Sequence, residues 1–175
     1  MRPNTIRPHF KYRDESSYTL HKMELYKDIL LEEERRKILK FAKTQIKDLG
    51  ENYPGLQSKS NIHTFKEFRI FLKRIKKYLK GYKIQKCWVN YSCGNYISFH
   101  QHKEISMVYF LENKSNMGPM FLEKSNPPVS WDSLFQVNMS QCPENSLLIF
   151  DRDVIHSVPC HLKEDRYSIA IELIK

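Results

Sequence analysis

The stretch "YISFHQHKEISMVYFLE", residues 96–112, contains two short apolar segments rich in β-branched and aromatic residues, separated by a polar turn. Such segments are typical of β-strands. Side chains alternate between the two faces of a strand, so a strand running through 99–104 would project His100, His102 and Glu104 from one face. The stretch therefore predicts a sheet protein with three potential metal ligands on one side of a strand.

More segments of the same kind follow and precede this stretch. They are "KCWVNY", "PMFLEK", "SLLIFD", "DVIHSV" and "RYSIAIEL", and Asn, Gly, Pro and Asp stand in the breaks. Upstream of these strands the apolar spacing changes to three and four, which predicts helices over 27–50 and 64–83. In the second helix the predicted buried stripe is Phe65, Phe68, Phe71 and Ile75. We therefore expect a mostly β fold with N-terminal α-helices, a sandwich or barrel supported by two helices.

Length and composition indicate one globular domain of 175 residues, with a helical support over 1–86 and a strand-rich core over 87–175. No apolar run approaches the roughly 20 residues of a membrane span, and no signal peptide is recognisable, so we expect no membrane partner. None of the four cysteines forms a C-x-x-C pair. This pattern argues against a zinc cluster and favours a reducing, cytoplasmic location.

The formal net charge of +9 is distributed unevenly along the chain. Residues 1–86 contain 22 Lys and Arg against 10 Asp and Glu, whereas residues 87–175 contain 7 against 10. A basic half can attract a polyanion or an acidic partner. It can equally be the solvated surface of the two predicted helices, and the composition leaves both interpretations open.

A second group of polar residues lies near the C-terminus. His156 precedes the last predicted strand, and Arg166 and Ser168 share one face of that strand, while Tyr167 and Ile169 point the other way. Arginine can bind a carboxylate through two parallel hydrogen bonds, and a neighbouring hydroxyl can add a third. This pair therefore predicts a binding site for a carboxylate.

The order of these motifs resembles that of the iron(II)- and 2-oxoglutarate-dependent oxygenases. The resemblance covers about residues 87–174 and is greatest to a subgroup of small oxygenases with the pattern W-x-N…G…H-x-H…H…R-x-S. In this chain the pattern consists of Trp88, Asn90, Gly94, His100, His102, His156, Arg166 and Ser168. It implies a double-stranded β-helix, the jelly-roll or cupin-like fold.

The resemblance also implies a chemistry. Non-haem Fe(II) oxygenases hold iron through three protein ligands and leave the remaining positions open. By analogy, the co-substrates are 2-oxoglutarate and O2, and the far carboxylate of 2-oxoglutarate contacts Arg166 and Ser168, with Tyr91 as a further hydrogen-bond donor. The implied reaction hydroxylates a C–H bond of an unidentified substrate while 2-oxoglutarate is decarboxylated to succinate.

Two sets of metal ligands remain possible. The family usually has Asp or Glu two residues after the first histidine, but that position here is His102. One set is His100, His102 and His156, and the spacing from Gly94 to His100 favours it. The other set is shifted by two residues and consists of His102, Glu104 and His156.

Two other functions also fit parts of the sequence. One is a three-histidine, cupin-type dioxygenase that uses no 2-oxoglutarate, against which the Arg166 and Ser168 pair argues. The other is a non-enzymatic metal-binding barrel whose basic helices bind nucleic acid. No RNA-binding aromatic motif, zinc finger or basic zipper accompanies the charge, so only weak, nonspecific nucleic-acid binding is expected.

Overall fold

The computed structural model describes residues 23–48, 56–93, 97–122, 136–138, 142–152, 154–158 and 164–175. Gly94 and Cys160 lie outside these ranges. Within them, no helix combines the length and the apolar character needed to span a membrane. Of the cysteines in this part of the chain, Cys87 and Cys142 are buried, Cys93 is exposed, and all three are free thiols.

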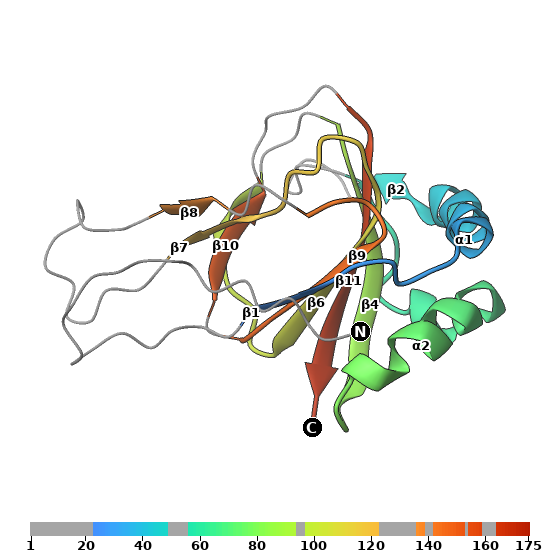
Figure 1. Cartoon of the computed structure of the whole chain (residues 1–175), viewed down its shortest axis with the longest axis horizontal. Coiled ribbons are helices and arrows are strands. Elements are labelled where there is room, and N and C mark those ends of the chain that lie inside the picture. The colour runs from blue at the N-terminus through green and yellow to red at the C-terminus, as the bar shows by residue number, and fades with distance from the viewer. Residues whose placement is uncertain are drawn as a thin grey trace, which may run out of the picture.

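Two antiparallel sheets face one another (Figure 1). The larger, seven-stranded sheet has the order β1-β9-β6-β11-β4-β3-β2, and the smaller, four-stranded sheet has the order β5-β10-β7-β8. The strands of the larger sheet are β1 Met23–Tyr26, β2 Lys47–Asp48, β3 Leu56–Gln57, β4 Lys83–Ser92, β6 Ile105–Asn113, β9 Ser146–Phe150 and β11 Arg166–Ile174. Those of the smaller sheet are β5 Ile97–His100, β7 Met120–Leu122, β8 Gln136–Asn138 and β10 Ile155–Val158.

The central strand β11 separates the two faces of the larger sheet by strict alternation. Arg166, Ser168 and Ala170 line the space between the sheets. Ile169, Ile171 and Leu173 belong to the core on the opposite face. Arg166 and Ser168 therefore lie on the opposite face of the strand from Ile169, as their spacing predicted.

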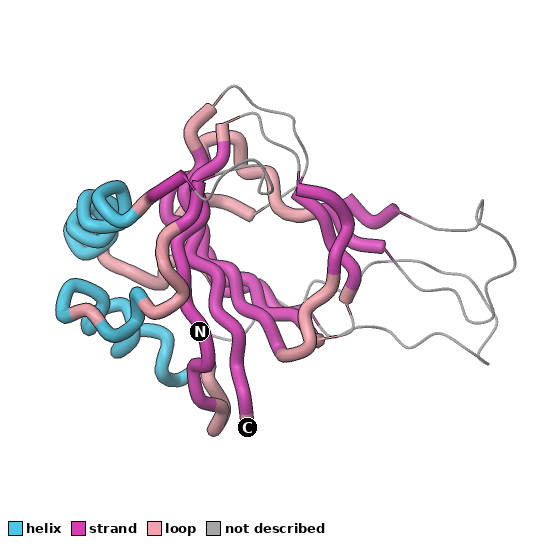
Figure 2. Tube along the Cα trace, turned by 180° about the vertical axis from the view of Figure 1, so that it is seen from behind, coloured by secondary structure: helices cyan, strands magenta, loops and turns pink. Residues whose placement is uncertain are grey.

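The helices cover the outer face of the larger sheet (Figures 1 and 2). They are α1 Glu32–Gln45 and a helical segment made of η2 Lys66–Phe68, α2 Arg69–Ile75 and η3 Lys76–Tyr78. A further 3-10 turn, η1 Ile62–Thr64, precedes this segment. Ile38, Phe71 and Ile75 pack with Val89 and Tyr109 of the sheet in one buried cluster. Burial of this apolar surface holds the helices on one face of the larger sheet, and the other face of this sheet lines the cavity.

The structure corrects the predicted helix boundaries. The first helix ends at Gln45, because Ile46 is extended and begins the chain's path into β2. The second helix begins two residues late, at Lys66, and Phe65 remains 37% exposed rather than buried. It ends before 83, since Lys80 and Gly81 both adopt positive φ, +48° and +88°, which stops a right-handed helix.

The part of the chain before residue 87 is not only helical. Strands β1, β2 and β3 and the first residues of β4 lie there, and all of them join the larger sheet. Strands β2 and β3 escaped prediction because two residues each are too short for a visible alternation, and the four-residue β1 directly precedes the segment predicted as the first helix.

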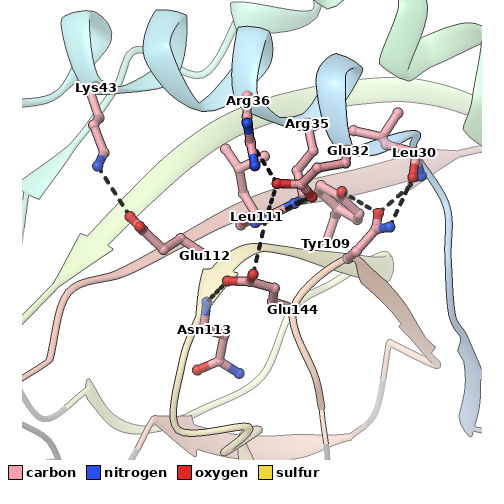
Figure 3. Close-up of polar contacts among 11 residues, drawn as sticks. Leu30, Glu32, Arg35, Arg36, Lys43, Tyr109, Leu111, Glu112, Asn113 and Glu144 are labelled. Atoms are coloured by element: carbon pink, nitrogen blue, oxygen red, sulfur yellow. Dashed lines mark hydrogen bonds and ion pairs between the residues drawn. The ribbon is translucent and has the colours of Figure 1, made fainter.

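A polar network ties α1 to the sheet (Figure 3). Arg35 donates from Nη1 to the carbonyl of Leu111 at 2.8 Å, and its Nη2 lies 3.0 Å from Glu144. Next to it, the Asn145 Oδ1 accepts from the Leu30 amide at 2.9 Å and from the Tyr109 hydroxyl at 2.8 Å, while its Nδ2 donates to the Leu30 carbonyl at 2.9 Å. These contacts join the turn before β9 to the chain that enters α1.

Candidate metal and anion site

Three histidines meet on the smaller sheet at its inner face. His100 ends β5, His156 lies directly opposite it on β10, and His102 follows β5 by two residues. Each offers a ring nitrogen, and these nitrogens all lie within 4.8 Å of one another. Three imidazoles at such distances form a plausible divalent metal site.

The second ring nitrogen of each histidine already has a partner. Nδ1 of His100 lies 2.8 Å from the carbonyl oxygen of Ser98, and Nδ1 of His156 lies 3.2 Å from that of Val154. Nδ1 of His102 lies 3.0 Å from a carboxylate oxygen of Glu172. Carbonyl and carboxylate oxygens only accept hydrogen bonds, so each Nδ1 carries a proton, and in the neutral ring Nε2 is the nitrogen with the free lone pair.

The surroundings keep two of these rings neutral. Burial, together with the neighbouring His100, lowers the pKa of His156 to about 3. The same two causes, in the same order, lower the pKa of His102 below its usual value, although Glu172 acts in the opposite direction. Since a protonated imidazole cannot bind a metal, these lowered pKa values keep the lone pairs available at neutral pH.

Glu104 does not join the cluster. Strand β5 ends at His100, and residues 101–104 form the connection that carries the chain from the smaller sheet to β6 in the larger one. The alternation expected for a continuous strand over 99–104 therefore stops after His100. Among the described residues, the group able to hold a metal consists of the three histidines alone.

Arg166 lies on the larger sheet, facing the same space. Its side chain is buried at 8% exposure, its Nε has no hydrogen-bond partner, and its guanidinium carbon lies 5.2 Å from the centroid of the Phe110 ring. No ion pair involves Arg166 in the described part of the chain. Burial lowers its pKa to about 10, so the side chain still carries its charge at neutral pH.

Ser168 is buried beside Arg166 on the same face, at 5% exposure. Tyr91, by contrast, is not brought to this space. It lies on β4 next to Asn90, which lines the cavity, so alternation turns Tyr91 to the other face. There its ring lies tilted against that of Tyr167, with the centroids 4.8 Å apart, and its hydroxyl donates to Asp165 at 2.7 Å.

One cavity of about 350 Å³ connects the two groups of residues. The smaller sheet contributes the histidines, and the larger sheet contributes the arginine and serine. Its lining is His100, His102, His156, Arg166 and Ser168 with Gln57, Trp88, Asn90, Ile97, Ser98, Val108, Pro119, Val158 and Ala170. A cluster of three imidazoles and a buried cation thus share one space.

Two residues at this site, Gln57 and Glu172, were not predicted from the sequence. Gln57 comes from β3, a two-residue strand, and donates to Asn90 Oδ1 at 2.6 Å. Glu172 follows Ser168 by four residues on the same strand, so alternation alone could have placed it on the site face. Its pairing with His102, seventy residues earlier in the chain, depends on the sheet register.

The sequence matches no protein-family model and no curated protein. Similarity appears in the structure. HygX from Streptomyces hygroscopicus, solved with nickel, 2-oxoglutarate and hygromycin B bound, gives a TM-score of 0.68 at 10% identity over 86% of this chain and 82% of HygX. The non-haem alpha-ketoglutarate-dependent epimerase SnoN from nogalamycin biosynthesis gives 0.65 at 10% identity, over 87% of this chain and 77% of SnoN.

A third similar structure is a prolyl hydroxylase from Trichoplax adhaerens in complex with a peptide fragment of hypoxia-inducible factor. It gives a TM-score of 0.57 at 14% identity, over 87% of this chain and 83% of the hydroxylase. The chain therefore shares its fold with enzymes that bind a metal and 2-oxoglutarate.

Proposed function

We propose that this protein is an Fe(II)- and 2-oxoglutarate-dependent oxygenase with a double-stranded β-helix core over 87–175 and a support over 1–86, working in a reducing, cytoplasmic compartment. In the proposed reaction a substrate C–H group, 2-oxoglutarate and O2 give the hydroxylated substrate, succinate and CO2. His100, His102 and His156 are the proposed iron ligands, and Arg166 and Ser168 bind the far carboxylate of 2-oxoglutarate.

The observation that carries this proposal is the buried guanidinium of Arg166, whose Nε has no hydrogen-bond partner and which forms no ion pair with a described residue. A buried charge without a partner is costly, and proteins retain one where a ligand of opposite charge completes the site. Arg166 faces the histidine cluster across a single cavity, so an anion bound to it extends toward the cluster. A dicarboxylate with one end on the metal and one on Arg166 fits this arrangement.

The residues present suit Fe(II). The three imidazoles, each with Nδ1 engaged elsewhere, leave Nε2 for a metal, and borderline ligands of this type bind iron. When bound, the iron and its co-substrate supply the oxidising chemistry. The protein's own contribution is to hold the imidazoles neutral and oriented, to orient the dicarboxylate through Arg166 and Ser168, and to exclude water.

The decisive experiment separates 2-oxoglutarate binding from metal binding. In Arg166→Ala we expect the dissociation constant for 2-oxoglutarate to rise by about 1.5 to 3.5 orders of magnitude, because loss of such a charge-assisted bond costs about 2–5 kcal/mol. Metal binding should persist, since Arg166 does not contact the histidines. Both are measured by isothermal titration, with Mn²⁺ in place of Fe²⁺ under anaerobic conditions.

Tyr91→Phe serves as the control, because the Tyr91 hydroxyl faces away from the cavity, and its 2-oxoglutarate affinity should equal that of the wild type. An unchanged affinity in folded Arg166→Ala would instead favour the three-histidine dioxygenase that needs no 2-oxoglutarate. A wild-type protein that bound neither Mn²⁺ nor 2-oxoglutarate would contradict the proposed function and both metal-binding alternatives.

A further inference from the structure

Glu172 is the only charged partner of the histidine cluster within the described residues. Its Oε1 lies 3.0 Å from His102 Nδ1, and its Oε2 lies 3.1 Å from Lys86 Nζ. We propose that Glu172 is a positioning residue that supplies, through His102, the negative charge that a three-histidine metal site lacks. This inference rests on the metal site of the proposed function and adds a role for a residue outside its ligand set.

The charge balance of the site gives the reason. Many non-haem iron sites combine two histidines with one carboxylate, which cancels one unit of the metal's charge. Three neutral imidazoles cancel none. A carboxylate that accepts the Nδ1 proton of a ligating histidine raises the basicity of its Nε2 and stabilises the bound cation.

The three histidines differ in the group that accepts a hydrogen bond from Nδ1. His100 and His156 donate to the neutral backbone carbonyls of Ser98 and Val154. His102 alone donates to a carboxylate. The negative charge therefore reaches the cluster through one defined ligand.

The sheet holds Glu172 in this position. Lys86 is its direct neighbour across the β11–β4 pairing, and a register irregularity follows immediately after Glu172. With one oxygen on Lys86, the other is directed at His102. The Glu172 side chain is only 14% exposed, so solvent screens its effect on His102 less than it would screen a surface carboxylate.

The alternative is that Glu172 merely forms an ion pair with Lys86, whose side chain is 53% exposed. Pairs of this kind contribute little to stability. Glu172→Gln separates the two roles, because glutamine retains an oxygen that can accept from His102 Nδ1 but removes the charge. A role in orientation alone predicts that Glu172→Gln behaves as the wild type.

The test measures metal binding without turnover. The metal-free protein is titrated with Mn²⁺ in the absence of 2-oxoglutarate, and we expect the dissociation constant to rise about 10–100-fold in Glu172→Gln. Glu112→Gln is the matched control. Its carboxylate is similarly shielded, at 18% exposure, and pairs with Lys43, but on the helix side of the sheet (Figure 3), so its metal affinity should not change.

A second readout reports charge directly. In the iron-loaded proteins, removal of the negative charge favours Fe(II) over Fe(III), so the reduction potential should shift upward in Glu172→Gln and stay constant in Glu112→Gln. Should Glu172→Gln not fold, Glu172→Asp takes its place, because the shorter side chain withdraws the carboxylate from His102, and both quantities should move in the same directions.

If the wild type binds metal, and Glu172→Gln has the same metal affinity and reduction potential as the wild type, the proposed role of Glu172 is wrong. A folded wild-type protein that binds no divalent metal would overturn the proposed function, and this inference with it. The two failures are therefore distinguishable in the same titrations.

Discussion

His102 is the histidine that both possible ligand sets share. Its replacement by alanine removes a ligand whichever set is correct, and no other described residue lies close enough to take its place. We expect His102→Ala to abolish iron binding while the protein stays folded. Iron content is measured per chain after anaerobic reconstitution and desalting, with circular dichroism to confirm the fold.

Glu104→Gln is the companion variant that distinguishes the two sets. Since Glu104 lies in the connection between the sheets and outside the histidine cluster, it should retain the full iron content. Loss of iron from Glu104→Gln would mean that the shifted set, with His102, Glu104 and His156, is the true one. Iron retained in both His102→Ala and His156→Ala would mean that the site lies elsewhere.

At single positions, the sequence was informative wherever a strand was long enough for its alternation to be read. On the nine-residue β11, alternation placed Arg166 and Ser168 together and turned Tyr167 away. The same rule misplaced Glu104, because β5 ends four residues earlier. The contact between Glu172 and His102 could not be predicted, since it depends on how strands distant in sequence are paired.

At the scale of helices and strands, the turn before β9 contains a side chain, Asn145, that links separate elements of the fold. Asn145 makes three hydrogen bonds that join this turn to the chain entering α1 and to the buried Tyr109. We expect Asn145→Gly to lower the free energy of unfolding by about 2–3 kcal/mol, because each such bond contributes on the order of 1 kcal/mol. Urea denaturation provides the measurement.

Asn116→Gly is its matched control. Both asparagines adopt a left-handed conformation, with φ of +64° at Asn145 and +58° at Asn116, which glycine accepts easily. Asn116 is exposed, and its side chain makes none of the bonds that hold Asn145, so its replacement should change stability by less than about 0.5 kcal/mol. Equal losses in the two variants would show that the backbone conformation, rather than the hydrogen bonds, sets the effect.

The types of element were predictable, but their limits were not. Apolar residues at spacings of three and four indicated both helical segments, because their buried side chains follow one stripe. The ends were missed where local geometry decides them, as at Ile46, which is extended. Strands β1, β2, β3 and β8, of two to four residues each, were missed because the sheet, and not their own sequence, holds them.

In the molecule as a whole, three exposed lysines of the outer helical segment lie on the far side of the larger sheet from the cavity. Lys73, Lys76 and Lys77 are exposed on the helical segment that covers the outer face (Figure 1). Lys80, which falls in the same predicted helix, is instead paired with Glu24 at 2.9 Å. A separation of this kind places the lysines away from any chemistry at the histidines.

We therefore expect only weak, sequence-independent binding of DNA or RNA, which disappears at physiological salt. A polyanion partner would lose affinity with salt at a slope of about 0.7–0.9 per phosphate neutralised. Combined Lys73→Glu, Lys76→Glu and Lys77→Glu changes should leave the slow consumption of 2-oxoglutarate without substrate unaffected. If nucleic acid accelerates this consumption in the wild type but not in the variant, nucleic acid becomes the leading candidate substrate.

The division of the site between two sheets has a consequence for the protein's motions. The imidazoles come from the four-stranded sheet and the connection that leaves it, and Arg166 and Ser168 come from the seven-stranded sheet. A ligand that contacts both groups therefore links the two sheets. Binding to the native state alone stabilises it by about 2.7 kcal/mol at a ligand concentration one hundred times the dissociation constant.

This stabilisation should be local as well as global, because any opening that separates the two sheets also breaks the contacts of the bound ligand. With Mn²⁺ and 2-oxoglutarate bound, backbone amides of β5 and β10 should exchange with deuterium more slowly by a larger factor than those of α1, which packs on the opposite face. In Arg166→Ala, metal alone should slow exchange in the smaller sheet, and added 2-oxoglutarate should slow it no further. Uniform slowing across β5, β10 and α1 would show instead that the two sheets open only together, as one cooperative unit.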